Sequence, residues 1–288
     1  MKFSILVAHF NNAVYFKDCY ESIIQQTYTD WEVIIVDDCS EKHEKEALQE
    51  LIRNDDRFFL YENATNRGVG YTKNKCIELA TGEICGFLDP DDALTPDALE
   101  KSIKPYSDQN IIGTYSRFYI CDDHLAIQKL FPHSGRIRNG SQYFFNINFE
   151  IAHFFTFKND KYTNRDMIDE TLSSAVDQDL YLKLYDKGEL AFINRSLYLY
   201  RIHSQGVSQS KSKKEKLYRN WHKVLYNTLT RRGIKTFYKT DIQQISRLPD
   251  FIFKKQNTLS SKFFRKIIKT IDNFLHGSIT AVPLLFLI

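Results

Sequence analysis

Over the first 120 residues, short apolar runs alternate with segments whose apolar residues recur at helical spacing. In the first helical segment, for example, Phe16, Cys19 and Ile23 fall on one face. Uninterrupted apolar runs are typical of parallel strands in a sheet that is covered on both faces. The pattern predicts strands at residues 3–10, 31–36, 58–61, 84–88 and 111–121, and helices at 14–28, 45–53, 71–80 and 96–103.

Polar or acidic side chains come directly after four of these strands. In open α/β sheets, ligands bind beyond the carboxyl ends of the strands, where such side chains converge. The arrangement therefore predicts a nucleotide-binding edge. The residues are Asn11 and Asn12 after the first strand, Asp37 and Asp38 after the second, Asn63, Asn66 and Arg67 after the third, and Asp89 to Asp92 after the fourth.

Three carboxylates, Asp89, Asp91 and Asp92, lie within four residues at the end of the fourth strand. Two carboxylates about 5 Å apart repel by roughly 3 kcal/mol at an effective dielectric constant near 20, and a turn needs only one aspartate. One interpretation is a solvated turn that leads into a helix, with Thr95 as N-cap and Pro96 at the first helical position. The other is a site where a divalent cation offsets the repulsion and holds phosphate oxygens.

The net charge of +3 conceals a strong asymmetry along the 288 residues. Residues 1–210 carry 22 Lys and Arg against 32 Asp and Glu, whereas residues 211–288 carry 17 against 4. We expect a domain boundary near Ser210 and a basic end that binds an acidic partner or surface. No motif that reads bases accompanies the charge, so nucleic acid is not expected as a partner.

The basic region contains two amphipathic segments and ends in ITAVPLLFLI, which is too short to span a membrane. One interpretation places the region on an anionic lipid surface. The other packs its helix on the sheet domain and leaves the basic face in water. The apolar positions that share a face are Leu217, Trp221, Val224, Leu225 and Thr228 in residues 213–232, and Phe264, Ile267, Ile268 and Ile271 further on.

The five cysteines and the N-terminus indicate the compartment. No two cysteines have CxxC spacing, which predicts scattered buried thiols in a reducing compartment. The start, MKFSILVAHFNN, predicts a first strand rather than a signal peptide. No stretch reaches about 18 apolar residues. We therefore expect a cytoplasmic protein, with the basic end as the part that would contact a membrane.

Two common nucleotide-binding motifs are missing. A dinucleotide fold places GxGxxG after its first strand, but here that strand leads to HFNNAVYF, which has no glycine. The partial match Gly68-Val69-Gly70 follows the third strand and lacks the third glycine. No GxxxxGK[ST] segment occurs either.

Five segments of the chain, in order, resemble blocks of a family 2 glycosyltransferase with the GT-A fold. They are SILVAHFNN, SIIQQTYTDWEVIIVDDCS, NRGVGYTKNKCIELATGEICGFLDPDD, VDQDLYLKLYDKG and YRIHSQGVS. The resemblance implies a mostly parallel, Rossmann-like sheet in a catalytic domain at residues 1–210, followed by a basic helical extension at 211–288. It also implies inverting transfer of a sugar from a nucleotide-diphosphate donor, with a UDP-sugar favoured, to a hydroxyl of a glycan or lipid-linked glycan.

The resemblance implies a metal site around the acidic turn. Asp91 corresponds to the last carboxylate of the DxD pattern and is the expected ligand of Mg²⁺ or Mn²⁺, which suit carboxylate and phosphate oxygens. Asp89 is expected at the ribose or the metal shell, and Asp92 at the cap of the following turn. His203 is expected to complete the metal shell or to donate to the diphosphate.

On the nucleotide side, the resemblance implies that Asp38 accepts the imide N–H of a uracil, while Asp37 braces the loop. Asn66 and Arg67 are expected at the base or the diphosphate, the latter through its planar fork. In this chain Ala8 and His9 replace a common Pro-Thr pair, and His9 is expected to affect how the nucleobase loop sits.

The expected general base is Asp177, in SSAVDQDLYLKL. Val176 stands where a glutamate is usual, so Asp179 remains the alternative base. The aspartate that is not the base is expected to interact with the helix dipole.

A nucleotidyltransferase and a catalytically silent sugar-nucleotide binder or membrane scaffold stay open as alternative functions. The sugar, acceptor and linkage depend on residues 123–175, for which the pattern predicts no structure.

Overall fold

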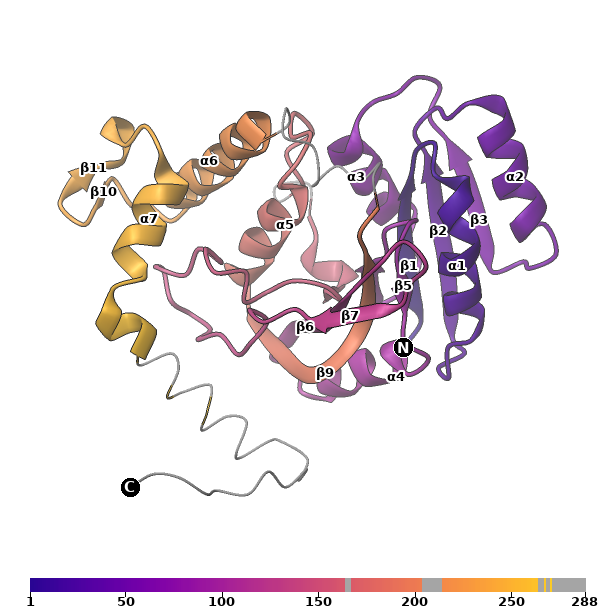
Figure 1. Cartoon of the computed structure of the whole chain (residues 1–288), viewed down its shortest axis with the longest axis horizontal. Helices are drawn as coiled ribbons and strands as arrows, with labels where there is room; N and C mark the ends of the chain where they lie inside the picture. The colour runs from indigo at the N-terminus through magenta and orange to yellow at the C-terminus, as the bar shows by residue number, and fades with distance from the viewer. Residues whose placement is uncertain (164–166, 204–213, 264–266, 268–269, 271–288) are drawn as a thin grey trace.

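The computed structural model describes residues 1–163, 167–203 and 214–263, together with Ile267 and Thr270. A mixed sheet of nine strands runs through the described chain, and helices lie on both of its faces (Figure 1). In chain order the elements are β1 (Phe3–His9), α1 (Ala13–Ile24), β2 (Trp31–Asp37), α2 (Lys42–Ile52), β3 (Phe58–Glu62), α3 (Val69–Leu79), β4 (Ile84–Phe87), β5 (Ala93–Leu94), α4 (Ala98–Ile103), η1 (Lys104–Ser107), β6 (Ile111–Cys121), β7 (Ile127–Leu130), β8 (Thr156–Lys158), η2 (Asn159–Lys161), α5 (Val176–Tyr185), β9 (Glu189–Arg201), α6 (Lys214–Arg231), β10 (Thr236–Phe237), β11 (Thr240–Asp241), η5 (Ile242–Gln244) and α7 (Leu248–Gln256).

The strand order is β3-β2-β1-β4-β8-β6-β9-β5, and β7 pairs with β6. β1 is parallel to β2 and β4, and β2 is parallel to β3, so the parallel arrangement predicted for the first four strands is confirmed. β8 lies antiparallel between β4 and β6, which makes the sheet mixed. The carboxyl ends of β1, β2, β3 and β4 therefore meet at one edge, as the polar residues after these strands predict.

Alternate side chains of the central strands enter two different hydrophobic cores. In β2, Ile34 and Val36 pack in one core, whereas Val33 and Ile35 pack in the other, and all four are at most 1% exposed. Full burial of an aliphatic side chain stabilises the fold by about 1.5–3 kcal/mol. Apolar residues of α3, α5 and α6 line the first core, and those of α1, α2 and α4 line the second. The uninterrupted apolar strands are thus explained by burial on both sides.

The predicted helices and strands agree with the structure to within four residues at each end, with one correction at the fourth helix. Its N-cap residue is Asp97, not Thr95. The backbone N–H of Thr95 donates to the carbonyl of Leu197 at 3.0 Å, because β5, just before it, pairs with β9. Thr95 is therefore held beside the sheet, and the helix begins two residues later.

Residues 123–175 carry β7 and β8, neither of which the pattern predicts. β8 has only three residues, too few to show a period. Its position is set by tertiary contacts, in which the hydroxyl of Thr156 bonds to those of Tyr106 and Thr114, both at 2.7 Å.

Four of the five cysteines are buried and free, as predicted, but the prediction was wrong for Cys39. Cys39 is exposed and has a positive φ of 64°. It lies just after β2, where the chain turns at the edge of the sheet, so its side chain leaves the core.

The described part of the basic region packs on the sheet domain, at the side of the molecule opposite β3 and α2 (Figure 1). Val224, Leu225 and Leu229 of α6 are at most 1% exposed and share a core with α5. Leu217 departs from the predicted buried face and is 42% exposed. Among the residues described, no helix is long and apolar enough to cross a membrane. The boundary near Ser210, Phe264, Ile268, Ile271 and the ITAVPLLFLI segment lie outside the described residues.

Candidate active site

The β2 end of the site is a closed network around Asp37. His9 Nδ1 lies 2.8 Å from Asp37 Oδ1, and the backbone N–H and hydroxyl of Ser40 both donate to the same carboxylate, at 2.8 and 2.5 Å. Burial alone would raise the pKa of Asp37, but the hydrogen bonds from His9 and Ser40 lower it below its ordinary value. Asp37 therefore braces the loop after β2.

Asp38 organises the neighbouring loop after β3. Its carboxylate is buried and accepts the backbone N–H groups of Arg67 and Gly68, each at 2.8 Å, and the side-chain amide of Asn63 at 2.8 Å. Gly68 has a φ of 86°, a conformation that glycine adopts without strain. Asp38 thus bonds to the protein itself in this structure, and its predicted contact with a nucleobase stays a prediction.

Two further residues predicted for the nucleotide lie at the rim. Asn66 and Arg67 are both exposed. The guanidinium of Arg67 lies over the ring of Tyr71, 4.0 Å from its centroid. This contact holds the planar fork at the edge of the sheet, where Asp38 positions the backbone beneath it.

The acidic turn after β4 contains one buried carboxylate and two that face the site. Asp92 is 1% exposed and accepts the hydroxyl of Tyr198 at 2.6 Å and the backbone N–H of Arg201 at 2.7 Å. Burial, together with Asp91 and Asp89, raises the pKa of Asp92 well above its ordinary value. Asp92 therefore anchors the turn to β9.

Asp91 and His203 form the pair predicted to bind a metal. His203 Nε2 lies 2.8 Å from Asp91 Oδ2, and the ring of Tyr15 packs on the histidine at 4.5 Å between centroids. Burial and the neighbouring Asp89 raise the pKa of Asp91, although His203 opposes the rise. Carboxylate oxygens suit Mn²⁺ and Mg²⁺, so Asp91 fits such an ion, with the His203 imidazole beside it as a nitrogen donor.

The described residues contain no group of three or more His, Cys, Asp or Glu side chains that could hold a metal ion. A cation at Asp91 and His203 would therefore take its remaining ligands from phosphate oxygens and water. Magnesium ions that serve phosphate chemistry are commonly bound in this way, through one or two carboxylates and the substrate.

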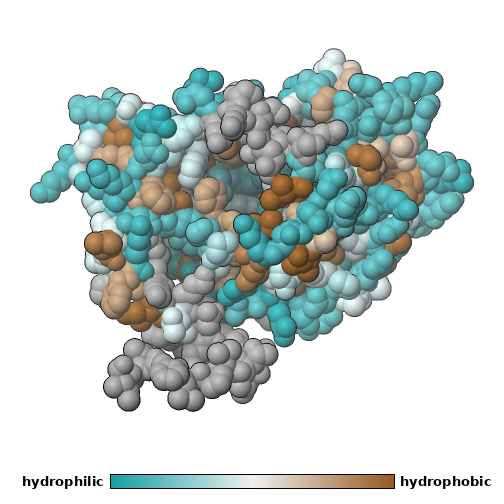
Figure 2. Space-filling view, viewed as in Figure 1, coloured by the Kyte–Doolittle hydropathy of each residue, from teal (hydrophilic) through white to brown (hydrophobic). Residues whose placement is uncertain are grey.

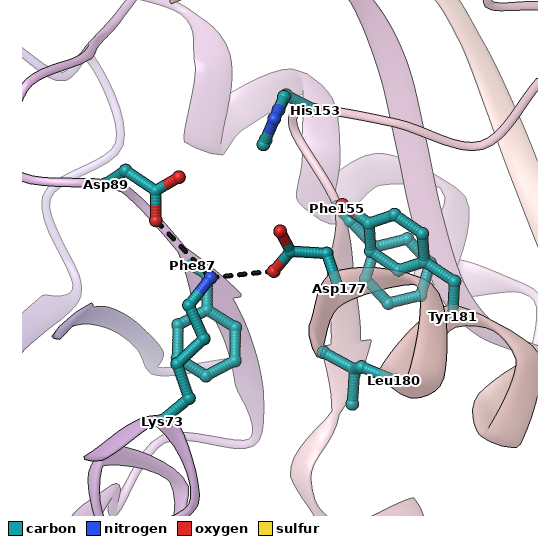
Figure 3. Close-up of a pocket in the computed structure, with 8 residues that line it drawn as sticks. All are labelled: Lys73, Phe87, Asp89, His153, Phe155, Asp177, Leu180 and Tyr181. Carbon is teal, nitrogen blue, oxygen red and sulfur yellow. Dashed lines mark hydrogen bonds and ion pairs between the residues drawn. The ribbon is translucent and has the colours of Figure 1, made fainter. Parts of the chain in front are cut away.

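Lys73 joins the acidic turn to the predicted base. Its ammonium lies 2.7 Å from Asp177 Oδ1 and 3.3 Å from Asp89 Oδ1, and its side chain is only 4% exposed (Figure 3). Burial alone would lower the pKa of Lys73, but the two carboxylates raise it above its ordinary value. Burial alone would likewise raise the pKa of Asp177, yet Lys73, with a contribution from His153, lowers it.

Lys73 and Asp177 are 104 residues apart in sequence, and the packing of α3 against the segment before α5 brings them together. The side-chain amide of Asn74 donates to the carbonyl of Ile168 and accepts its backbone N–H, both at 3.0 Å. A Cβ on Gly70 would lie 3.0 Å from the carbonyl oxygen of Asp169. This close approach sets the first turn of α5 over Lys73.

Asp179, the alternative base, is placed differently. It is 1% exposed and accepts the backbone N–H of Asp169 at 2.8 Å and the ammonium of Lys183 at 2.7 Å. It does not line the pocket that contains Asp177. Of the two aspartates in the first turn of α5, the structure brings only Asp177 together with Asp89.

A pocket lies between the acidic turn and α5. Figure 2 shows this face of the molecule hollowed over α5, between the part that carries α6 and the part that carries β1 and β2. Charged groups line one part of the pocket and aromatic rings another, so it presents both polar atoms and flat apolar surface. Its lining residues are Lys73, Phe87, Asp89, His153, Phe155, Asp177, Leu180 and Tyr181.

Sequence reasoning missed the two basic residues of this pocket, Lys73 and His153. A signal for Lys73 was available, because it falls on the same helical face as Gly70 and Ile77, which are buried, and a lysine on a buried face is rare unless it is paired. His153 lies in the irregular segment before β8, where no period marks which side chains point inward.

Comparisons with known proteins match the chain to a described family and to solved structures. The profile of a family described as Glycosyl transferase family 2 matches residues 4–165, more than half of the chain. The chain is 28% identical over 259 residues to a chondroitin synthase of Escherichia coli, and the aligned region is 88% of this chain and 36% of that protein. It is 27% identical over 278 residues to a hyaluronan synthase of Pasteurella multocida, with 94% and 27% covered. The chain thus spans only about a third of the length of these relatives.

Solved structures share the fold. Residues 1–349 of S. aureus TarS, in complex with UDP-GlcNAc, superpose with a TM-score of 0.63 at 17% identity, over 97% of this chain and 77% of that one. A mannosyltransferase from Pyrobaculum calidifontis, in complex with GDP-Man and Mn²⁺, gives a TM-score of 0.56 at 14% identity, over 96% and 76%. The predicted GT-A architecture is therefore confirmed.

Proposed function

This chain belongs to glycosyl transferase family 2, and from that membership we propose that it transfers a sugar from a nucleotide-diphosphate donor to a hydroxyl group, with inversion at the anomeric carbon. One observation carries the proposal: Asp89 and Asp177, from elements far apart in sequence, meet in one pocket on either side of Lys73. Transfer requires cationic help for a leaving diphosphate and a base for the acceptor, and this pocket holds both kinds of group.

Asp177 is the proposed general base. Lys73 lowers the pKa of Asp177 and so keeps its carboxylate ionised near neutral pH, the form that a general base requires. The first turn of α5 holds it opposite the acidic turn, so an acceptor hydroxyl beside Asp177 attacks from the face away from the leaving diphosphate. That in-line arrangement gives inversion.

The acidic turn is the proposed site of the donor's diphosphate. Asp91 and His203 would hold Mn²⁺ or Mg²⁺, which would supply positive charge where the diphosphate leaves. Asp38, Asn66 and Arg67, at the same edge of the sheet, are the proposed contacts of the nucleobase and ribose, and Asp89 is a proposed contact of the ribose or the metal shell. We favour a UDP-sugar because TarS, which superposes better on this chain than the mannosyltransferase does, binds UDP-GlcNAc. The mannosyltransferase binds GDP-Man, so GDP-Man is the alternative donor.

A thermal-shift screen tests the donor and the metal together. Wild-type protein is melted with UDP-Glc, UDP-Gal, UDP-GlcNAc, UDP-GalNAc or GDP-Man, each with and without MnCl₂. A ligand at 100 times its Kd stabilises the folded state by about 2.7 kcal/mol, which is roughly 4–5 °C for a chain of this size. We expect one donor to produce this shift only with Mn²⁺, and Asp91→Asn to abolish it.

The alternative enzyme, a nucleotidyltransferase, would need a Gly-rich loop after β1. The segment there, HFNNAVYF, has no glycine.

The acceptor that fits is a growing glycan or a lipid-linked precursor, since the matched relatives are synthases of polysaccharides by name.

We also propose that the basic region rests on an anionic membrane at the cytoplasmic side. At the end of its described part, Phe253, Leu259 and Phe263 are between 49% and 88% exposed, and Lys254, Lys255 and Lys262 are interleaved with them. Removal of residues 260–288 should reduce binding to vesicles that contain phosphatidylserine, and unchanged binding would count against this part of the proposal.

A further inference from the structure

His153 lines the same pocket and, apart from its contribution to the lowered pKa of Asp177, takes no part in the machinery described above. Its ring lies across the pocket from Phe87, with Asp89 and Asp177 to either side (Figure 3). Neither of its ring nitrogens has a hydrogen-bond partner among the described residues, since the interactions of His153 are ring contacts and a bond from the hydroxyl of Ser116 to its backbone carbonyl. A polar group in such a position is one that a ligand can satisfy.

Aromatic contacts rather than hydrogen bonds orient the imidazole. The ring of Tyr198 stacks on it at 4.6 Å between centroids and 17° between planes, Tyr200 stacks at 5.6 Å, and Phe118 meets it edge-on at 5.5 Å. Tyr198 is itself held by its hydrogen bond to Asp92 at 2.6 Å. The third aspartate of the acidic turn therefore fixes the plane in which the His153 nitrogens face the pocket.

The imidazole is neutral near pH 7, because burial lowers the pKa of His153 even though Asp89 and Asp177 oppose the shift. A neutral imidazole has one N–H donor and one acceptor nitrogen. A sugar hydroxyl also donates and accepts, so the two groups are complementary. A phosphate oxygen, which only accepts, would use one half of this capacity.

We propose that His153 determines donor specificity by binding a hydroxyl of the sugar that is transferred. The inference rests on the proposed function, in which the diphosphate lies at the acidic turn and the acceptor at Asp177. Lys73 fills the space directly between Asp89 and Asp177, so the transferred sugar must lie over these carboxylates, in the pocket that His153 also lines. A site built to bond a substrate hydroxyl discriminates strongly against analogues that lack it, because its own polar groups are then left unpaired.

The test compares the affinity for UDP, which lacks the sugar, with that for a UDP-sugar. Binding is measured by titration calorimetry with Mn²⁺ for wild type, His153→Phe and His153→Gln, with the UDP-sugar that gives the largest thermal shift in wild type. Phenylalanine keeps a ring to pack on Tyr198 and Tyr200 but has no nitrogen, whereas glutamine keeps a donor and an acceptor. His133, which is exposed and packs on Phe131 outside the pocket, provides the control His133→Phe.

We expect His153→Phe to bind the UDP-sugar about threefold to tenfold more weakly, the range that one hydrogen bond supplies, and to bind UDP within twofold of wild type. His153→Gln should bind the UDP-sugar more tightly than His153→Phe, and His133→Phe should match wild type. Equal losses for UDP and UDP-sugar, or no loss in His153→Phe, would overturn the inference. If wild type binds UDP but no UDP-sugar more tightly, His153 has no sugar to contact and the inference is also wrong. Failure of wild type to bind any of these nucleotides would overturn the proposed donor as well, and that result is read before any variant.

Discussion

The two acidic clusters of this molecule look alike in sequence and differ in how their charge is balanced. At the end of β2, Asp37 and Asp38 are buried, and backbone N–H groups, the Ser40 hydroxyl, the Asn63 amide and the His9 imidazole bond to their oxygens. At the end of β4, Asp89 is paired with Lys73 and Asp91 with His203. Either aspartate can exchange its partner for a ligand. The first cluster stabilises loops, whereas the second holds charge that a substrate or a cation can use.

The largest expected effect is on catalysis, from Asp177→Asn. A general base contributes about 10²–10⁴ to the rate, so kcat should fall by that factor while the Kd of the donor changes little. The matched control is Asp179→Asn, which lies two residues on but bonds to Asp169 and Lys183. This control should lower the melting temperature and leave kcat of the folded protein within about tenfold. Similar kcat values for the two variants would remove Asp177 as the base.

The next largest effect is on stability, from Asp38→Ala. The substitution leaves the backbone N–H groups of Arg67 and Gly68 and the amide of Asn63 without their acceptor. Each hydrogen bond to a charged group is worth about 1.5–3 kcal/mol, so the free energy of unfolding should drop by about 2–4 kcal/mol after relaxation of the loop. Urea denaturation measures the change. A loss below about 1 kcal/mol would show that the network at β2 is weaker than its geometry indicates.

A smaller effect is a shift of pH dependence in Lys73→Met. In wild type the pKa of Asp177 is depressed, so the activity that needs its carboxylate persists above that pKa and is lost as the pH falls through it. Without Lys73, burial dominates and the pKa of Asp177 should rise, which moves the acidic limb of the kcat/KM profile to higher pH. The dependence of stability on pH should reverse: in wild type the contribution of Asp177 is lost as the pH falls through its depressed pKa, whereas in the variant stability is lost as the pH rises through the raised pKa. An acidic limb that does not move would indicate that Lys73 does not control this carboxylate.

The smallest expected effect is on the stability of Asp91→Asn. Burial and Asp89 already disfavour the Asp91 anion, so a neutral side chain should leave the melting temperature unchanged or raise it by the equivalent of about 1 kcal/mol or less. The same variant should lose the Mn²⁺-dependent shift. A clear loss of stability would place Asp91 with Asp37 and Asp38, among the carboxylates that hold loops, and would blur the contrast between the clusters.

The part of the sheet formed by β1 to β4 could be predicted from the sequence, because these strands carry local signals. Each is an apolar run that ends in a polar group, and the parallel order follows from the helices between them. The edge that gathers Asp38, Asp89 and Asp91 could be predicted for the same reason. The N-cap at Thr95 was wrong because β5, only two residues long, pairs with β9 about 100 residues later, and no local signal records such a pairing.

The sequence by itself determined the fold class, the loops that carry the acidic groups and the type of chemistry those groups suit, since each depends on residues close together in the chain. Only the tertiary structure decided what each carboxylate does. Asp177 and Asp179 are two residues apart on one helical turn, yet one faces Lys73 and the pocket and the other bonds to Asp169 and Lys183. The partner of a buried charge comes from whichever segment packs against it, and α3, β9 and the segment before β8 reach this site from distant parts of the chain.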